Sequence, residues 1–190
     1  MKFPTVSYLV LLATSVIAHE IGEHDDHSNL QFHDILERST VPTAPHRRNT
    51  IEFPPPQYPE VGLCKQTAAD GAKLAVQFHP GKIREIGCYR NCTCPGTSDH
   101  CCGLAVDLMC TTGLNVRDRD DYGRAIGEWA VKYRFALNLK YVIWGRKIWN
   151  PTLDPPSGWE GWRLMEDRGS DTQNHWDHVH ISFNEARPVF

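Results

Sequence analysis

The sequence predicts one α+β domain in which a mainly antiparallel sheet carries its helices on one face. The length of 190 residues suits one domain better than two. Two segments have the apolar periodicity of a helix, and several short segments have the alternation or apolar composition of strands. The order of these segments along the chain indicates a mainly antiparallel sheet.

The first helix is predicted near Gln66–Phe78, where alanine, leucine and phenylalanine recur at helical intervals before the turn pair Pro80-Gly81. The segment "KIREIGCY" that follows alternates well enough for a strand. The cysteine-rich stretch "RNCTCPGTSDHCCG" is then a loop, and its Gly103 allows a sharp turn into the short buried strand "LAVDLM".

The longest helix is expected in "RDRDDYGRAIGEWAVKYRFAL", where Tyr122, Ile126, Ala130 and Tyr133 share one face after an acidic start. Two further strands are predicted in "LKYVIWGRKIW", and a last one in "HVHISF". The segment "EDRGSDTQNH" is expected to be a loop at the rim of a cleft. Residues 60–190 therefore form the predicted folded domain.

Residues 1–18 have the pattern of a secretory signal peptide. A single lysine precedes an apolar run, which ends in small residues suited to cleavage after Ala18. The run is too short for a permanent transmembrane helix, and nothing downstream approaches the roughly 20 apolar residues that one needs. Residues 19–59 are polar, histidine-dotted and proline-rich, which predicts a disordered leader or propeptide. We therefore expect a secreted, extracellular protein with no membrane span.

The seven cysteines agree with export, because an oxidising compartment converts most such thiols to disulfides. One cysteine is then left over, and the pairing cannot be deduced from the spacing. Metal binding by thiolates is the less favoured alternative, because the repeated Cys-x-x-Cys pairs of structural zinc sites are absent. The cysteines are Cys64, Cys88, Cys92, Cys94, Cys101, Cys102 and Cys110.

The charges are nearly balanced, with 20 basic and 23 acidic residues and no basic block. This composition argues against a nucleic-acid partner. We expect a monomer. Asn91 begins the sequon "NCT", so the protein is a candidate glycoprotein.

Side chains that lie far apart in the sequence suggest a zinc site. His100 and Asp107 lie seven positions apart in "SDHCCGLAVDLM". If "HVHISF" is a strand, His178 and His180 point to the same face, about 7 Å apart. Imidazole and carboxylate are zinc ligands, and a catalytic zinc takes three protein ligands and leaves a fourth position for water. His100, Asp107 and His180 supply such a set, and His178 or Asp177 is left as a base.

The ten residues "SDHCCGLAVD" fit the pattern Ser-x-His-x-x-Gly-x-Ala-x-Asp at every fixed position, and a His-x-His follows near the C-terminus. With these motifs the chain resembles the zinc peptidases of the D-alanyl-D-alanine carboxypeptidase, lysostaphin and hedgehog group. The segments "YVIWGRKIW", "GWRLMEDRGS" and "NHWDHVHIS" also resemble secreted actinobacterial and fungal proteins that share this fold. The resemblance covers roughly residues 60–190. It implies a hedgehog/D,D-peptidase-like fold and a bound Zn²⁺ held by His100, Asp107 and His180.

The resemblance also implies catalytic roles for Arg90, Asp177 and His178. Tyr89-Arg90 is similar to a Tyr-Arg pair of the carboxypeptidase branch, whose arginine polarises the scissile carbonyl. One branch of the group places its base three positions before the last ligand, here Asp177, and another places it two before, here His178. Strand alternation favours His178, in which case Asp177 could hold a histidine ring in its tautomer. Both assignments remain open at this point.

Together these features predict a secreted zinc hydrolase that cleaves an amide bond in a peptide, with a cell-wall peptide as the favoured substrate. The alternative is a catalytically inactive, zinc-stabilised module that binds a glycan or a protein. Tryptophans could stack on sugar rings in such a module, although tryptophans near a hairpin more often pack in the core. The tryptophans concerned are Trp144, Trp149, Trp159 and Trp162.

Overall fold

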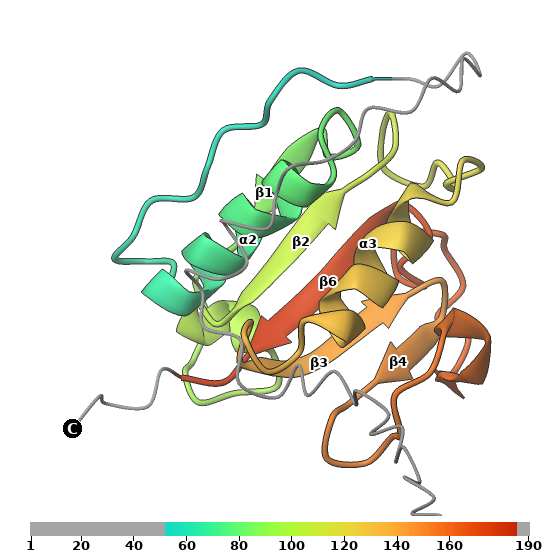
Figure 1. The fold of residues 1–190 in the computed structure, drawn as a ribbon. Helices are drawn as coiled ribbons and strands as arrows, with labels where there is room; N and C mark the ends of the chain where they lie inside the picture. Colours follow the sequence, from blue (N-terminus) through green and yellow to red (C-terminus); the bar gives the residue numbers. More distant parts are fainter. Residues whose placement is uncertain (1–51, 186–190) are drawn as a thin grey trace, which may run out of the picture.

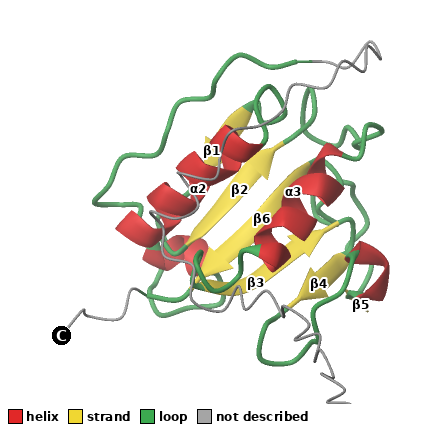
Figure 2. Cartoon of the chain, viewed as in Figure 1, coloured by secondary structure: helices red, strands yellow, loops and turns green. Residues whose placement is uncertain are grey.

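The computed structural model describes residues 52–185, in which a six-stranded sheet carries two α-helices on one face (Figure 1). Short connections and two 3-10 helices complete this part of the chain (Figure 2). The arrangement confirms the predicted α+β class. The elements are α2 (Gln66–Phe78), β1 (Glu85–Gly87), η2 (Asp99–Cys102), β2 (Ala105–Met109), α3 (Tyr122–Lys132), β3 (Leu139–Trp144), β4 (Lys147–Trp149), η3 (Trp159–Gly161), β5 (Arg163–Leu164) and β6 (His178–Phe183).

The strands follow the order β1-β2-β6-β3-β4-β5, and each neighbouring pair is antiparallel. The last strand, β6, therefore lies in the middle of the sheet, between β2 and β3 (Figure 1). In the pairing of β2 with β6, Asp107 stands directly opposite His180. Two residues 73 positions apart in the chain are thus neighbours in the sheet.

Alternation along the two central strands separates a packed face from a polar face. Val106 and Leu108 of β2, and Val179 and Ile181 of β6, belong to the apolar core beneath the helices. The intervening side chains of the same strands point to the other face of the sheet. That face carries the aspartate and the histidines that the sequence singles out.

Two of the predicted elements, α2 and β6, have the predicted bounds. The predicted long helix is shorter, because the acidic stretch before it forms a turn. In that turn the Asp118 carboxylate accepts the backbone N–H groups of Asp120 and Gly123, and α3 begins only at Tyr122. The two-residue strand β5 was not predicted, since two residues are too few to show the alternation of a strand and both side chains are exposed.

The predicted signal peptide, residues 1–18, and most of the predicted leader, residues 19–59, lie outside the described residues. Residues 52–59 contain no helix or strand. The backbone N–H of Phe53 donates to the Gly81 carbonyl, which ties this segment to the folded domain. None of the helices in residues 52–185 is long and apolar enough to cross a membrane.

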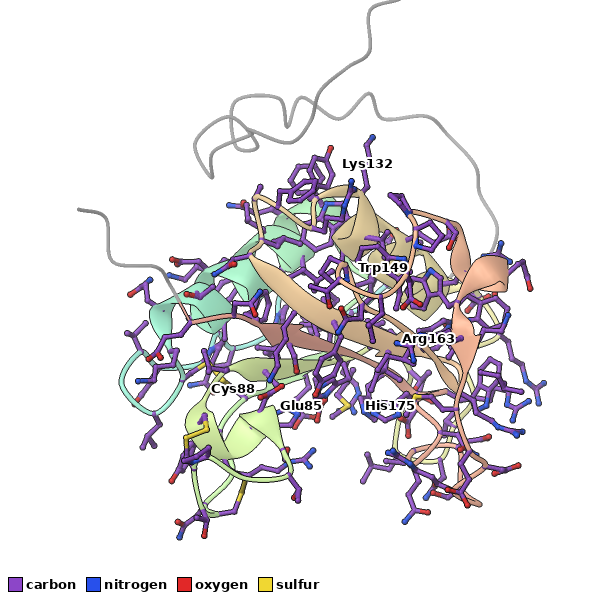
Figure 3. The ribbon with its side chains drawn as sticks, turned by 90° about the horizontal axis from the view of Figure 1, so that it is seen from below. Glu85, Cys88, Lys132, Trp149, Arg163 and His175 are labelled. Atoms are coloured by element: carbon purple, nitrogen blue, oxygen red, sulfur yellow. A yellow bond between two sulfur atoms is a disulfide. The ribbon has the colours of Figure 1, made fainter. Side chains whose placement is uncertain are left out.

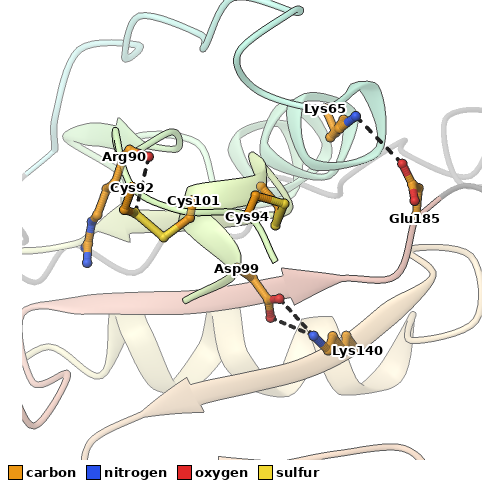
Figure 4. The surroundings of a disulfide bond; sticks show 9 residues. Lys65, Arg90, Cys92, Cys94, Asp99, Cys101, Lys140 and Glu185 are labelled. Carbon is orange, nitrogen blue, oxygen red and sulfur yellow. Dashed lines mark hydrogen bonds and ion pairs between the residues drawn. A yellow bond between two sulfur atoms is a disulfide. The ribbon is translucent and has the colours of Figure 1, made fainter. Parts of the chain in front are cut away.

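Six of the seven cysteines form three disulfides, and the remaining Cys110 is buried as a free thiol, as the cysteine count predicts. One bridge, Cys64–Cys88, joins the segment before α2 to the segment after β1. The other two, Cys92–Cys101 and Cys94–Cys102, lie close together beside η2 (Figure 4). These two bridges fix residues 92–102, the loop that contains His100, which we call the stapled loop.

The tryptophans pack within the domain. Trp144, Trp149 and Trp162 are buried in the core. Trp159 is half-buried, and its ring meets that of Trp176 edge to face at a centroid distance of 6.0 Å. Three of the four tryptophans considered for sugar stacking therefore have no exposed ring face, which leaves the packing interpretation.

Candidate metal centre

Three of the residues predicted from the sequence meet on the polar face of the sheet. Asp107 comes from β2, His180 from the facing position of β6, and His100 from η2, which packs beside β2. All three side chains are buried. Their ligand atoms lie within 4.8 Å of one another, and they form the one such cluster of His, Cys, Asp and Glu found in the described part of the chain.

The position of His100 depends on a tight loop. The 3-10 helix that contains it ends at Gly103, whose φ of 66° lies in the left-handed region, as the expected sharp turn requires. A Cβ atom at position 103 would lie 2.1 Å from the Leu63 carbonyl oxygen, so only glycine fits there. The two disulfides beside η2 fix the same loop from its other side.

The donor atoms form a small triangle. His100 Nε2 lies 3.1 Å from Asp107 Oδ1 and 3.2 Å from His180 Nδ1, and His180 Nδ1 lies 2.9 Å from Asp107 Oδ1. Two ligands bound to zinc at about 2.1 Å with tetrahedral angles would be about 3.4 Å apart. The triangle therefore needs to widen by only a few tenths of an ångström to hold such an ion.

The chemistry of the donors also fits a cation. His100 Nδ1 is hydrogen-bonded to the Cys88 carbonyl oxygen, and because a carbonyl only accepts, Nδ1 carries the proton. In the neutral ring the lone pair of Nε2 then points at the Asp107 carboxylate oxygen, which is also an acceptor. Two acceptors at this distance repel unless a cation or a second proton lies between them. A carbonyl that fixes the tautomer of a ligating histidine is a common arrangement around zinc.

The Asp107 carboxylate is stabilised as an anion. Burial alone would raise its pKa, but the contacts with the His100 and His180 rings and the nearby histidine charges hold the pKa well below its ordinary value. Its second oxygen, Oδ2, accepts a hydrogen bond of 2.8 Å from Arg90 Nη2. Most of the Arg90 side chain, 61%, remains exposed. The guanidinium of Arg90 thus contacts the cluster, while most of the side chain is open to solvent.

His178 and Asp177 form a second pair beside the cluster. His178 Nδ1 donates to Asp177 Oδ1 at 2.6 Å, because the carboxylate can only accept. The other oxygen, Asp177 Oδ2, accepts from the Thr172 hydroxyl and from the Asn115 backbone N–H. Burial would raise the pKa of Asp177, but these hydrogen bonds lower it below the ordinary value. His178 Nε2 is left facing Asp107 Oδ1, 3.7 Å away.

A cavity of about 650 Å³ opens over this arrangement and is lined by both predicted histidines of β6, by His100, by Asp107 and by Arg90. Thr97 and Ser98, which belong to the stapled loop, line one part of it. Another part is lined by residues of the connection between β5 and β6: Arg168, Thr172, Gln173 and His175. Figure 3 shows His175 on the side of the sheet away from the helices.

Sequence reasoning did not single out several of the residues around the cluster. The ring of Tyr141 stacks on His180 with an interplanar angle of 18°, and Ser182 Oγ lies 3.0 Å from His180 Nε2. The ring of His175 lies 4.8 Å from that of His178, and burial first, then the neighbouring positive charges, lowers its pKa to about 3. Ser182 carried a usable signal, since it lies two residues after His180 on the same strand face. His175 ends the segment "EDRGSDTQNH", which the sequence predicts as a loop at the rim of a cleft.

The predicted glycosylation site lies at the edge of the stapled loop. Asn91 is exposed, and the neighbouring Cys92 is bridged to Cys101. Asn91 directly follows Arg90, which lines the cavity.

Comparison with known proteins places the chain in a family. The model of the family described as "VldE, C-terminal domain" matches residues 60–176. An uncharacterized secreted protein of Arthroderma benhamiae is 56% identical over 137 residues, which cover 66% of this chain and 56% of the relative. The chain therefore spans little more than half of the length of that relative. No solved structure matches the chain.

Extracellular localisation rests on two independent findings. The Arthroderma relative is named as a secreted protein. The three disulfides are typical of a protein that matures in an oxidising compartment. The chain is a secreted protein, as its sequence predicts.

Proposed function

We propose that this chain, which belongs to the family of the VldE C-terminal domain, is a secreted zinc-dependent hydrolase that cleaves an amide bond in a peptide. We propose a cell-wall peptide as its substrate and a hedgehog/D,D-peptidase-like fold for its domain. One observation carries the proposal: a buried three-ligand set lies under an open cavity, beside a histidine that a carboxylate holds at 2.6 Å.

In this proposal His100, Asp107 and His180 hold the ion. The chemistry that Zn²⁺ supplies in such a site is Lewis acidity, which lowers the pKa of a water molecule to about 7. Three protein ligands are the number found in catalytic zinc sites, whereas structural sites close with four. The cavity above the three ligands leaves room for water and for a substrate.

The geometry supports His178 as the base and Asp177 as the residue that orients it. Because Nδ1 of His178 donates to Asp177, Nε2 carries the lone pair and can accept a proton from the attacking water. The same nitrogen then returns the proton to the leaving amine as the carbon–nitrogen bond breaks. Asp177 is poorly suited to act as the base itself, because both of its oxygens are engaged away from the ligand cluster.

Arg90 is suited to stabilise the negative charge that develops on the carbonyl oxygen. Its Nη2 is anchored on Asp107 Oδ2, which fixes the guanidinium at the edge of the cavity. A preoriented donor of this kind acts most strongly on a charge that forms only in the transition state.

Substitution of the paired residues tests this assignment. His178→Gln should retain zinc and lower the rate of hydrolysis by about 10²- to 10⁴-fold, the usual contribution of a general base. Asp177→Asn should cost about 10- to 100-fold, as expected for a residue that acts through its neighbour. Purified protein would be incubated with peptidoglycan fragments and a peptide library, with and without a chelator, while elemental analysis measures zinc.

Asp154→Asn is the matched control, because its carboxylate pairs with Arg163 outside the cavity and its loss should not change the rate. Absence of any chelator-sensitive product in every pool would overturn the catalytic proposal. If the protein retained its biological effect after both Asp177 and His178 were replaced by alanine, the zinc-stabilised binding module would be the better description.

A further inference from the structure

The loop between β5 and β6 places a second arginine at the cavity. Arg168 lines the same cavity as the ligand cluster and as Arg90. Arg90 precedes the stapled loop, whereas Arg168 comes from the segment before β6, and Figure 3 shows these two parts of the chain below the sheet, on the side away from the helices. Among the residues that line this cavity, Asp107 carries the only carboxylate.

The two guanidinium groups differ in their partners. Arg90 is bonded to Asp107. The guanidinium of Arg168 makes no hydrogen bond or ion pair with any residue between 52 and 185. The carboxylates next to it in the loop are occupied, since Asp167 pairs with Arg146 and Asp171 pairs with Arg117.

The backbone of Arg168 is nevertheless held in place. Its N–H donates to Asn174 Oδ1 at 2.9 Å, and Asn174 is buried. The Asn174 amide in turn donates to Asp167 Oδ1, which also accepts the Gly169 N–H. Arg168 is itself exposed, so its guanidinium is free to bind a planar anionic group at the cavity.

From this arrangement we infer that Arg168 forms a carboxylate-binding subsite that selects peptides carrying a carboxylate next to the scissile amide. A guanidinium group binds a carboxylate through two parallel hydrogen bonds, which fixes orientation as well as position. The carboxylate comes either from the C-terminus of the peptide or from an acidic side chain. This inference rests on the proposed hydrolase function, because it assigns that site its substrate class.

The charge of the cavity agrees with an anionic substrate group. Without an ion, the lining has two guanidinium groups against one carboxylate, and a divalent ion on the ligand cluster would add to the positive charge.

Binding of three matched probes tests the subsite without any need for turnover. The probes are an acetylated alanine tripeptide with a free C-terminus, its C-terminal amide, and the amide with aspartate as its last residue. Calorimetry would measure their dissociation constants at low salt with the full secreted chain, both loaded with zinc and after chelation. Wild-type protein should bind at least one carboxylate probe about tenfold or more tightly than the uncharged amide. The probe that binds more tightly shows whether the recognised carboxylate is the C-terminus of the peptide or an acidic side chain.

Variants assign that preference to Arg168. Arg168→Gln should abolish the preference for a carboxylate. Arg168→Lys should retain part of it, because lysine keeps the positive charge but lacks the two parallel N–H donors of a guanidinium. Arg119→Gln is the control, since Arg119 is exposed, has no partner among residues 52–185 and lines a different cavity. Equal affinity of wild-type protein for all three probes, or an equal loss in Arg119→Gln, would overturn the inference.

The two proposals can fail separately. A carboxylate preference that survives chelation and disappears in Arg168→Gln supports the subsite, even if no peptide is hydrolysed. Chelator-sensitive hydrolysis without any such preference supports the hydrolase and overturns the subsite.

Discussion

Asp107 contacts both the histidines of the ligand cluster and Arg90. One oxygen lies within hydrogen-bond distance of His100 and His180, and the other accepts a hydrogen bond from Arg90. The carboxylate therefore contributes to the ligand triangle and also orients the arginine that we assign to the oxyanion.

The first prediction concerns metal content. Purified wild-type protein should contain close to one zinc per chain, and Asp107→Ala should lose most of it, because two protein ligands bind zinc far more weakly than three. Elemental analysis of protein purified without added chelator measures this. Asp154→Ala removes a carboxylate outside the cluster and should leave the zinc content unchanged. A wild-type protein without zinc would remove the basis of the proposed site.

Sequence reasoning identified the ligand cluster more completely than its surroundings. His100, Asp107 and His180 carry a motif with fixed spacing, and strand alternation places His178 on the same face as His180. The proximity of Arg168 depends on the course of an irregular loop, and that of Tyr141 on the register between β3 and β6. Both residues lie in segments that support the family resemblance, and "EDRGSDTQNH" is predicted at the rim of a cleft, but neither segment has a period that brings its side chains to the ligand cluster.

The two helices differ in how well the sequence predicts their ends. The bounds of α2 follow from a regular pattern of small and apolar residues that ends before Pro80-Gly81. The start of α3 is displaced because Asp118 captures two backbone N–H groups that a longer helix would have used. Helical periodicity cannot reveal such competition, since the side chains on the buried face are unchanged.

The close approach of α3 to the sheet gives the second prediction. A Cβ atom at Gly123 would lie 2.3 Å from the ring of Trp144, which is buried. Gly→Ala in a helix normally stabilises by up to about 1 kcal/mol. Here Gly123→Ala should instead lower the free energy of unfolding by about 1 to 3 kcal/mol, because the indole has no space to move. Urea unfolding measures the change.

Gly113→Ala provides the comparison for that experiment. The nearest atom to a Cβ at position 113 is 3.8 Å away, in the side chain of Val116, so this substitution should be nearly neutral. If Gly123→Ala were as stable as the wild type, α3 could not pack on β3 as closely as described.

In the molecule as a whole, one face of the sheet carries the apolar core that stabilises the fold, and the other carries the candidate site. Both helices lie on one side of the sheet, over the apolar core (Figures 1 and 3). The ligand cluster, the paired histidine and the cavity lie on the other side. The disulfides on the cavity side fix a loop that has few apolar side chains of its own. Polar substitutions in the cavity can therefore change function while the core keeps the domain folded.

One titratable group on the core side makes global stability depend on pH. His79 caps the C-terminus of α2, its ring meets that of Trp129 edge to face, and its Nε2 is buried without a hydrogen-bond partner. Burial lowers its pKa from 6.5 to about 4. The folded state thus favours the neutral ring. The resulting stability is complete above pH 6.5 and is lost as the pH falls towards 4.

We therefore expect His79→Phe to be less sensitive to acid than the wild type. The phenyl ring keeps the contact with Trp129 but has no charge to bury. Thermal unfolding of both proteins between pH 7.5 and about 4, with a chelator throughout to exclude effects of metal release, should show a growing advantage for the variant. A shift of this size corresponds to about 2 to 3 kcal/mol at the acidic end. Because the two proteins differ only at residue 79, the difference between the two curves isolates His79. Parallel curves would contradict its assignment as a buried neutral group.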